Sequence, residues 1–229
     1  MGEKILLVRH MKSVQEDRLA QNLRTRGYDL DTRWVAQGDR LPAPDAAYKA
    51  AVIYGGAQMA SQSDQIDYLR DELAWIRSWV ADDRPLLGIC LGGQLLAKAF
   101  GAQVTRHPEA LSEIGYVPIS PVNGGKEIIP EALMVYQWHK EGFSLPENAE
   151  LLARGTVYPN QAFRLSKKVY GLQYHPEVTL DMMDHWVAEA GHMLDEPGAQ
   201  DWDAQLRQRQ VYHAPLGDWL EKFLDRWLV

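Results

Sequence analysis

The sequence contains a single cysteine, no long apolar run and no excess of positive charge. Because Cys90 has no second cysteine to pair with, no disulfide can form within the chain, and we expect a reducing, cytoplasmic location. No segment approaches the ~20 apolar residues of a membrane-spanning helix. The formal net charge of -7 argues against nucleic acid or a membrane as a partner.

Motifs that hold cofactors are also missing. The histidines lack metal-ligand spacing such as His-Glu-x-x-His, and no glycine-rich phosphate-binding loop is present. We therefore expect no metal, no cofactor and no use of ATP by this chain. With 46% hydrophobic and 24% charged residues over 229 positions, the composition is that of a soluble globular protein.

A Gly-x-Cys-x-Gly motif is the most informative stretch. A short apolar run, residues 85–89, leads into Cys90, and a helix-forming segment, residues 94–100, follows. Gly88 and Gly92 flank the cysteine, where larger side chains would crowd a sharp turn. This order predicts a strand that turns into a helix with the thiol at the corner, which is the nucleophile elbow of strand-turn-helix enzymes. The N-terminus of a helix favours the thiolate, the reactive form of cysteine.

The first half of the chain alternates predicted strands and helices. Short apolar runs predict strands, and apolar residues at helical spacing predict helices. The predicted strands are Lys4–Arg9, Tyr28–Val35, Tyr48–Tyr54 and the run before Cys90; the predicted helices run from Ser13 or Glu16 to Arg26 and from Gln65 to Val80; two prolines put Leu41–Pro44 in a loop. This alternation predicts an α/β fold with a doubly wound, mostly parallel sheet flanked by helices. Ligands bind such sheets beyond the carboxyl ends of the strands.

After Gly101 the pattern changes to short strand-like segments separated by Gly, Pro and Asn, which predict additional antiparallel strands. These segments are Gln103–Arg106, Ile114–Ile119, Leu133–Gln137, Leu151–Arg154, Gln161–Leu165 and Lys168–Gln173. The tail is predicted to be helical, with one apolar stripe from Leu216 to Leu228 that either docks on the body or joins two subunits. Docking is the common role of terminal helices. We therefore predict a domain over residues 1–180 and a C-terminal helical extension over residues 181–229, packed on the same domain.

A reactive thiolate needs a base, and the base needs an acceptor that orients it. Among 7 histidines, His175 stands out because a predicted strand runs directly into His175-Pro176-Glu177. Pro176 favours an extended backbone at His175, so that positions 175 and 177 project to the same face, about 6–7 Å apart at the backbone. A hydrogen bond between imidazole and carboxylate would close that gap. Together with the elbow, this motif predicts a triad of Cys90, His175 and Glu177.

The two motifs in combination resemble those of the class I (triad) glutamine amidotransferase family. The matching residues are Gly88-Ile89-Cys90-Leu91-Gly92-Gly93-Gln94 and Gln173-Tyr174-His175-Pro176-Glu177, within a similarity that extends from about Lys4 to Val178. The segment Trp138-His139-Lys140-Glu141 also resembles the GMP-synthase-like branch, in which Trp-His-Gly-Asp is common; Lys140-Glu141 stands here in place of Gly-Asp. The resemblance implies a flavodoxin-like fold and an amidohydrolase that stands alone.

The resemblance also implies catalytic roles. Cys90 would attack the side-chain amide of glutamine, form a thioester and release ammonia. His175 would act as base and then as acid, held by Glu177. The backbone N–H groups of Leu91 and Gly56 would form the oxyanion hole.

Three further residues are implied in substrate binding. Gln94 lies one helical turn past the cysteine and would contact the amino-acid end of the substrate. Tyr116 and His139 are candidates for the pocket wall.

Two enzyme functions fit these residues. The first is a glutaminase that supplies ammonia to a separate synthase, since the segment after Glu177 is too short for a synthase domain. The second is a stand-alone hydrolase of γ-glutamyl peptides or other γ-glutamyl compounds, which present the same γ-amide linkage to Cys90. The sequence does not decide between them.

Two functions of other classes are disfavoured. Leu7-Val8-Arg9-His10 resembles the opening of histidine phosphatases, but Met11 stands where that family has glycine. A non-catalytic binding module would be expected to lose a member of the triad, and Cys90, His175 and Glu177 are all intact.

Overall fold

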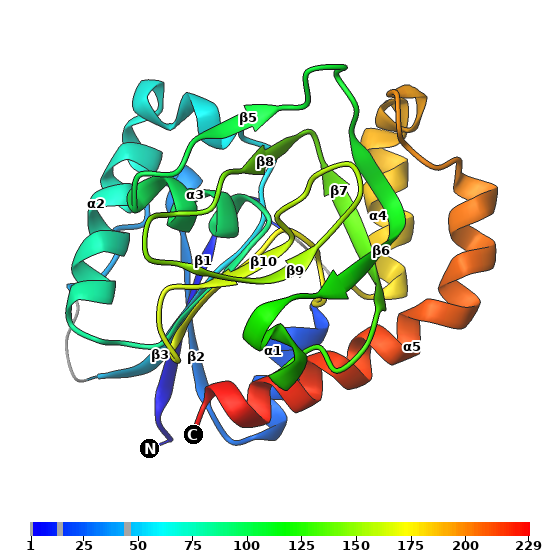
Figure 1. The fold of residues 1–229 in the computed structure, drawn as a ribbon. Coiled ribbons are helices and arrows are strands. Elements are labelled where there is room, and N and C mark those ends of the chain that lie inside the picture. Colours follow the sequence, from blue (N-terminus) through cyan, green and yellow to red (C-terminus); the bar gives the residue numbers. More distant parts are fainter. Residues whose placement is uncertain (1, 13–15, 44–46) are drawn as a thin grey trace.

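The structure, a computed structural model, describes residues 2–12, 16–43 and 47–229. Its strands are β1 Lys4–Arg9, β2 Asp29–Trp34, β3 Tyr48–Ile53, β4 Leu86–Ile89, β5 Val104–Arg106, β6 Glu113–Pro121, β7 Leu133–His139, β8 Glu141–Phe143, β9 Glu150–Arg154, β10 Ala162–Arg164 and β11 Val169–Leu172. Its α-helices are α1 Arg18–Thr25, α2 Asp67–Ala81, α3 Leu91–Ala99, α4 Leu180–Ala190 and α5 Trp202–Trp227 (Figure 1). Short 3₁₀ helices occupy Val35–Gln37, Ala60–Gln65, Asn123–Glu127 and Gly191–Asp195.

In the described residues the main sheet has 9 strands in the order β2-β1-β3-β4-β11-β10-β9-β6-β7, and β5 pairs separately with β8. The strands from β2 to β11 run parallel, and those from β10 to β7 are antiparallel to their neighbours. The predicted fold class is therefore confirmed. For one strand the prediction holds on one side only: residues 169–172 pair antiparallel with β10, as predicted, but β11 also pairs in parallel with β4 at the centre of the sheet. The partner of a short buried strand depends on tertiary contacts that a local pattern does not encode.

Helices cover both faces of the sheet, as the alternation within β1 requires. Ile5 and Leu7 belong to the apolar cluster that includes side chains of α1, α4 and α5. Leu6 and Val8 belong to the cluster that includes side chains of α2 and α3. Successive residues of a strand point to opposite faces, so a strand buried on both faces is apolar throughout.

The first helix begins later than predicted. It starts at Arg18 rather than at Glu16, because Asp17 caps it: the carboxylate accepts a backbone N–H of the first turn at 2.8 Å. The alternative start at Ser13 and the loop residue Pro44 lie outside the described residues.

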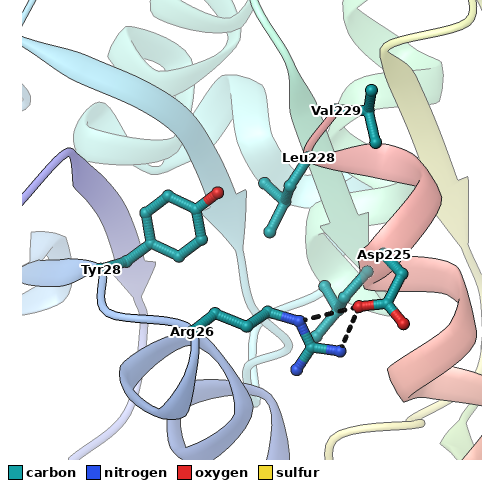
Figure 2. A pocket seen from close by; sticks show the side chains of 6 residues that line it. Arg26, Tyr28, Asp225, Leu228 and Val229 are labelled. Carbon is teal, nitrogen blue, oxygen red and sulfur yellow. Dashed lines mark hydrogen bonds and ion pairs between the residues drawn. The ribbon is translucent and has the colours of Figure 1, made fainter.

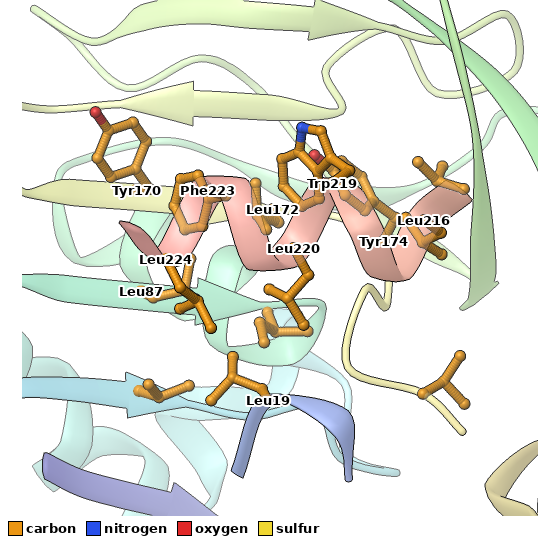
Figure 3. Close-up of a cluster of buried hydrophobic side chains, with 14 of the residues drawn as sticks. Leu19, Leu87, Tyr170, Leu172, Tyr174, Leu216, Trp219, Leu220, Phe223 and Leu224 are labelled. Atoms are coloured by element: carbon orange, nitrogen blue, oxygen red, sulfur yellow. The ribbon is translucent and has the colours of Figure 1, made fainter. Parts of the chain in front are cut away.

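Helix α5 buries its apolar stripe within this chain (Figure 3). The side chains of Leu216, Leu220 and Leu224 are fully buried, and Figure 3 shows them directed toward the sheet and α1. Trp219 and Phe223 stack beside them, with ring centroids 5.3 Å apart. The division of the chain at residue 180 stays a prediction. Although α5 has 26 residues, none of the described helices is apolar over a sufficient length to cross a bilayer.

Candidate active site

Cys90 stands at the corner between β4 and α3. Its φ is 51° and its ψ is -109°, a conformation that residues with a side chain rarely adopt. Such a backbone costs about 1–3 kcal/mol and persists where the surroundings hold it. Helix α3 begins at the next residue, Leu91, rather than at the predicted Gln94. The sharp strand-to-helix turn expected from the Gly-x-Cys-x-Gly motif is present in the structure.

Glycines allow α3 to approach the sheet closely. A methyl group added to Gly92 would collide with the carbonyl group of Ile53, at the end of β3. A methyl group added to Gly93 would lie 2.5 Å from the carbonyl oxygen of Leu172, at the end of β11. The first turn of α3 is therefore seated between the carboxyl ends of two strands, and only glycine fits at these two positions.

The pairing of β11 with β4 brings His175 to Cys90. The Cys90 N–H donates to the Leu172 carbonyl oxygen at 2.8 Å. The chain then bends, and the His175 N–H donates to the carbonyl oxygen of Tyr136 in β7 at 2.9 Å. Gly55 lies against both side chains, because a methyl group on it would be 3.5 Å from Cβ of Cys90 and 2.8 Å from Cε1 of His175. The side chains of Cys90 and His175 therefore lie on the same side of Gly55 and share this space.

Two residues hold the imidazole ring. The Nδ1–H of His175 donates to Oε1 of Glu177 at 2.8 Å, and both side chains are buried. Trp186 from α4 meets the same ring edge-on, with centroids 4.9 Å apart. The Glu177 carbonyl oxygen accepts the Arg18 N–H at 2.8 Å, which ties this turn to the start of α1. Because Nδ1 is engaged, Nε2 is the nitrogen left to face the thiol.

This environment favours the protonated imidazole. Burial alone lowers the pKa of His175, but the charge of Glu177, the interaction with Cys90 and the hydrogen bonds to both outweigh burial and raise the pKa to about 10. At neutral pH His175 therefore carries a proton that it can donate to a leaving group.

The two residues predicted for the oxyanion hole lie next to each other. A methyl group on Gly56 would be 2.9 Å from Cδ2 of Leu91 and 2.7 Å from Cβ of His10. The Leu91 N–H belongs to the first turn of α3, where N–H groups have no carbonyl partner within the helix. Their contact with a substrate oxygen stays a prediction.

Gln94 is 3% exposed, and its amide nitrogen is engaged inside the protein. Nε2 donates to the carbonyl oxygen of Glu141 at 2.7 Å and to Oε1 of Gln173 at 3.3 Å. These bonds connect α3 to β8 and to the segment before His175. The predicted contact of Gln94 with a substrate stays a prediction.

His139 lies in a buried polar network. One ring nitrogen, Nδ1, donates to the carbonyl oxygen of Glu141 at 2.9 Å, and the other, Nε2, lies 3.0 Å from Oε2 of Glu113. Gln161 also donates to that carboxylate oxygen, at 2.9 Å. Both ring nitrogens of His139 therefore have protein partners, and its predicted place in the pocket wall stays a prediction.

Tyr116 is fully buried among residues of α4 and α5. Its hydroxyl lies 3.7 Å from Sδ of Met183 and 3.2 Å from Nδ1 of His213. Burial raises the pKa of Tyr116 above its ordinary value. These contacts are those of a core residue, and nothing in them supports the predicted contact with a substrate.

Sequence patterns do not indicate two groups that lie beside the cysteine and histidine. The first is the aromatic pair Trp138 and Trp186, with ring centroids 5.8 Å apart. The Trp138 carbonyl oxygen lies 3.9 Å from Sγ of Cys90. The second is a buried pair of His10 and Glu72, separated by 62 positions. Two of these residues had a weak signal: Trp138 belongs to the segment that resembles the GMP-synthase-like branch, and His10 follows the first strand at the edge of the sheet where ligands bind.

Outside this region, the described residues raise two further questions: whether they hold a metal site, and where a hollow lies relative to Cys90. Within residues 2–12, 16–43 and 47–229, no three His, Cys, Asp or Glu side chains are grouped so that they could hold a metal ion. A hollow of about 300 Å³ lies between the end of α1 and the end of α5, where Arg26 and Asp225 form an ion pair at 2.6 Å (Figure 2). Tyr28 in its wall precedes β2, whereas Cys90 follows β4. The hollow therefore lies at the amino-terminal ends of the parallel strands, whereas Cys90 lies at their carboxyl ends.

Comparison with known proteins relates the whole arrangement to one family. The model of the family "Glutamine amidotransferase class-I" matches residues 8–192. The glutamine amidotransferase-like protein YfeJ of Salmonella typhimurium is 29% identical over 209 residues, which are 87% of each chain. A glutamine-hydrolysing GMP synthase subunit from Thermococcus kodakarensis is 40% identical over 96 residues, 41% of this chain and 51% of that protein. The chain thus matches about half the length of that relative.

Solved structures extend the similarity to the complete chain. A glutamine amidotransferase from Methylobacillus flagellatus has a TM-score of 0.92 at 29% identity, covering 100% of this chain and 95% of that one. One from Thermotoga maritima has a TM-score of 0.87 at 28% identity, covering 100% and 99%. Since the family model spans most of its length, the chain belongs to the class I glutamine amidotransferase family.

Proposed function

We propose that this protein hydrolyses the γ-amide of glutamine through a thioester on Cys90 and releases ammonia. The observation that carries the proposal is the position of His175, whose ring lies beside Cys90 at Gly55 and whose Nδ1 lies 2.8 Å from Oε1 of Glu177. A cysteine with a purely structural role would need neither a strained backbone nor a protonated imidazole beside it.

In the first half-reaction the Cys90 sulfur, as thiolate, attacks the carbonyl carbon of the side-chain amide. The C–S bond forms while the carbonyl electrons move to the oxygen, which the N–H groups of Leu91 and Gly56 stabilise. His175 donates its proton to the leaving nitrogen, so that the C–N bond breaks and ammonia departs from the thioester.

In the second half-reaction His175, now neutral, takes a proton from a water molecule that attacks the thioester carbon. The C–S bond breaks, glutamate leaves, and Cys90 and His175 return to their initial states. Glu177 keeps the ring orientation throughout by accepting the Nδ1–H and stabilises the imidazolium each time it forms. The reaction requires only water as a second reactant.

Similarity to the glutamine-hydrolysing subunits of GMP synthases supports delivery of the ammonia to a synthase on a separate chain. In this form of the proposal, glutamine turnover by the isolated protein is slow and increases when the synthase binds.

Hydrolysis of γ-glutamyl compounds is the second candidate function, and one observation favours it. Trp186 and Trp138 are half-buried beside His175, the group that protonates the leaving nitrogen. An ammonia leaving group uses none of this aromatic surface, whereas an amine with an apolar substituent would pack on it. In this form the isolated protein turns over γ-glutamyl peptides faster than glutamine.

The test is release of ammonia or amine by the isolated protein from glutamine and from γ-glutamylphenylalanine. Turnover of at least one substrate is expected, and Cys90→Ala should abolish it. A thiol-directed glutamine analogue should label the wild type once, since the chain has a single cysteine. Turnover that survives Cys90→Ala would contradict the mechanism, and the ratio of the two rates separates the two functions.

A further inference from the structure

A second histidine, His10, lies against Gly55 and against Gly56, the glycine of the proposed oxyanion hole. It directly follows β1, and its side chain is completely buried. Nε2 lies 2.9 Å from Oε2 of Glu72 in α2, whose side chain is also completely buried. Nδ1 lies 3.4 Å from the carbonyl oxygen of Gly55. The imidazole thus connects α2 to the end of β3.

These contacts fit an imidazole that carries a proton on both ring nitrogens. A carbonyl oxygen only accepts, so Nδ1 donates to Gly55, and Nε2 donates to the Glu72 carboxylate. Burial alone lowers the pKa of His10, but the charge and hydrogen bond of Glu72 and the Gly55 carbonyl group outweigh it and raise the pKa. A buried ion pair carries a desolvation penalty and is weak evidence of a purely stabilising role. The proposed chemistry of Cys90, His175 and Glu177 does not use it.

The peptide between Gly55 and Gly56 is the group that this pair restrains. Two consecutive glycines allow many backbone conformations, so the sequence alone does not fix the orientation of their peptide. The peptide is planar and trans, which means that fixing the Gly55 carbonyl also fixes the direction of the Gly56 N–H. His10 contacts both ends of the unit: its Nδ1 faces the carbonyl oxygen of Gly55, at one end of the peptide, and its Cβ would be 2.7 Å from a methyl group on Gly56, at the other end.

We infer that His10 is a positioning residue for the oxyanion hole. With Glu72 behind it, its imidazolium holds the Gly55 carbonyl so that the Gly56 N–H faces the oxygen that becomes negative when Cys90 attacks. His10 touches neither the substrate nor the reacting atoms. The inference rests on the proposed function, and it assigns to a buried ion pair a role in catalysis rather than in stability alone.

Substitutions can separate the two contacts of His10. Glutamine places its amide nitrogen near the position of Nε2, so His10→Gln keeps a donor for Glu72 and loses the bond to Gly55. Asparagine places its amide nitrogen near Nδ1, so His10→Asn combined with Glu72→Gln keeps the bond to Gly55 without a buried unpaired charge. Tyr68→Phe is a matched control on α2, since Tyr68 neighbours His10 with ring centroids 6.4 Å apart and its hydroxyl has no hydrogen-bond partner among the described residues.

Each variant is assayed for turnover of the preferred substrate and for alkylation of Cys90 by iodoacetamide, a displacement that forms no oxyanion. His10→Gln is expected to lower kcat by about 10–100-fold with little change in KM. The reason is that the hydrogen bond from an oxyanion-hole donor to the substrate oxygen acts mainly in the transition state, and a misdirected N–H no longer forms it. Its alkylation rate should stay within about twofold of the wild type. The double variant should recover most of kcat, and Tyr68→Phe should match the wild type.

Two results would overturn the inference: a kcat of His10→Gln equal to that of the wild type, or a loss of kcat matched by an equal loss of alkylation. A wild type that hydrolyses neither substrate would refute the proposed function instead. In that case crystal structures of the wild type, His10→Gln and the double variant test the positioning role of His10 without an activity assay. A turned Gly55–Gly56 peptide in His10→Gln, restored in the double variant, supports it, and an unchanged peptide refutes it.

Discussion

Trp186 meets the ring of His175 edge-on, with the two centroids 4.9 Å apart. The two residues come from α4 and from the bend after β11, and Trp186 also contacts Trp138 of β7. A half-buried aromatic pair therefore borders the imidazole that is proposed to protonate the leaving nitrogen. Any group carried by that nitrogen would lie near this apolar surface.

We expect Trp186→Ala to reduce activity on γ-glutamylphenylalanine more than activity on glutamine. An aromatic contact is worth ~0.5–1.5 kcal/mol, so the extra loss in kcat/KM should be up to about tenfold. The measurement is kcat/KM for both substrates in wild type and variant. Trp75→Ala, on α2, controls for the general loss of a tryptophan and should affect both substrates equally. An equal loss on both substrates in Trp186→Ala would exclude a role for Trp186 in leaving-group selection.

The protonated state of His175 predicts the alkaline limit of activity. Because the pKa of His175 is raised to about 10, kcat/KM should persist at mildly alkaline pH and fall as the pH rises through that value. Glu177→Gln removes the largest interaction that raises this pKa, so the alkaline limb should move to lower pH, and kcat should fall by about 10²–10⁴-fold. The check is the pH profile of kcat/KM, with exposed Glu147→Gln as the control. An unshifted limb in Glu177→Gln would contradict this assignment.

Close packing at the elbow predicts that Gly92→Ala reduces turnover. The new methyl group would collide with the carbonyl group of Ile53, and overpacking of this kind costs about 1–3 kcal/mol. Gly101→Ala is the matched control, since its φ of +85° adds strain but no atom lies within 4 Å of the new methyl group. Both variants should lose stability in urea unfolding. Only Gly92→Ala should lose more than about tenfold in kcat, because only its clash displaces the Cys90 corner.

His213 should make the protein sensitive to acid. Burial and the charges of Arg18 and Arg209 lower its pKa to about 4, and the Arg18 guanidinium donates to its Nε2, which must therefore be unprotonated. In the unfolded chain a histidine takes up a proton near pH 6.5. Between about pH 6.5 and about pH 4 the unfolded state thus binds a proton that the folded state does not, so stability falls as the pH falls through this range.

The corresponding measurement is urea unfolding at several pH values between 7 and 4. His213→Gln should lose less stability on acidification than the wild type, whatever its stability at pH 7. Exposed His192→Gln should follow the wild type. A slope in His213→Gln as steep as that of the wild type would show that other groups cause the acid sensitivity.

Features that depend on neighbouring residues are predictable from the sequence. The glycines beside Cys90 predict a sharp turn because only small side chains fit there, and the turn is present. Alternation of apolar strands and helices predicts the doubly wound sheet, since strands covered on both faces are apolar throughout.

Features that depend on distant partners are not predictable in this way. Several short apolar strands of similar composition could pair with β4, so composition does not identify β11 as its neighbour. Strand β8, with the three residues Glu141–Phe143, is too short to give a periodic signal. His10 and Glu72 are 62 positions apart, and neither segment indicates that the other will bury it. Nothing in β6 indicates that α4 and α5 cover Tyr116.

The pairing of β4 with β11 also has a consequence for the protein while it is being made. A ribosome completes the corner that carries Cys90 long before it has synthesised β11, whose Leu172 carbonyl oxygen accepts the Cys90 N–H. Until that last central strand is inserted, the sulfur has no imidazole beside it. A nascent or prematurely terminated chain that lacks β11 and His175 would therefore also lack the residue proposed as base and acid for Cys90.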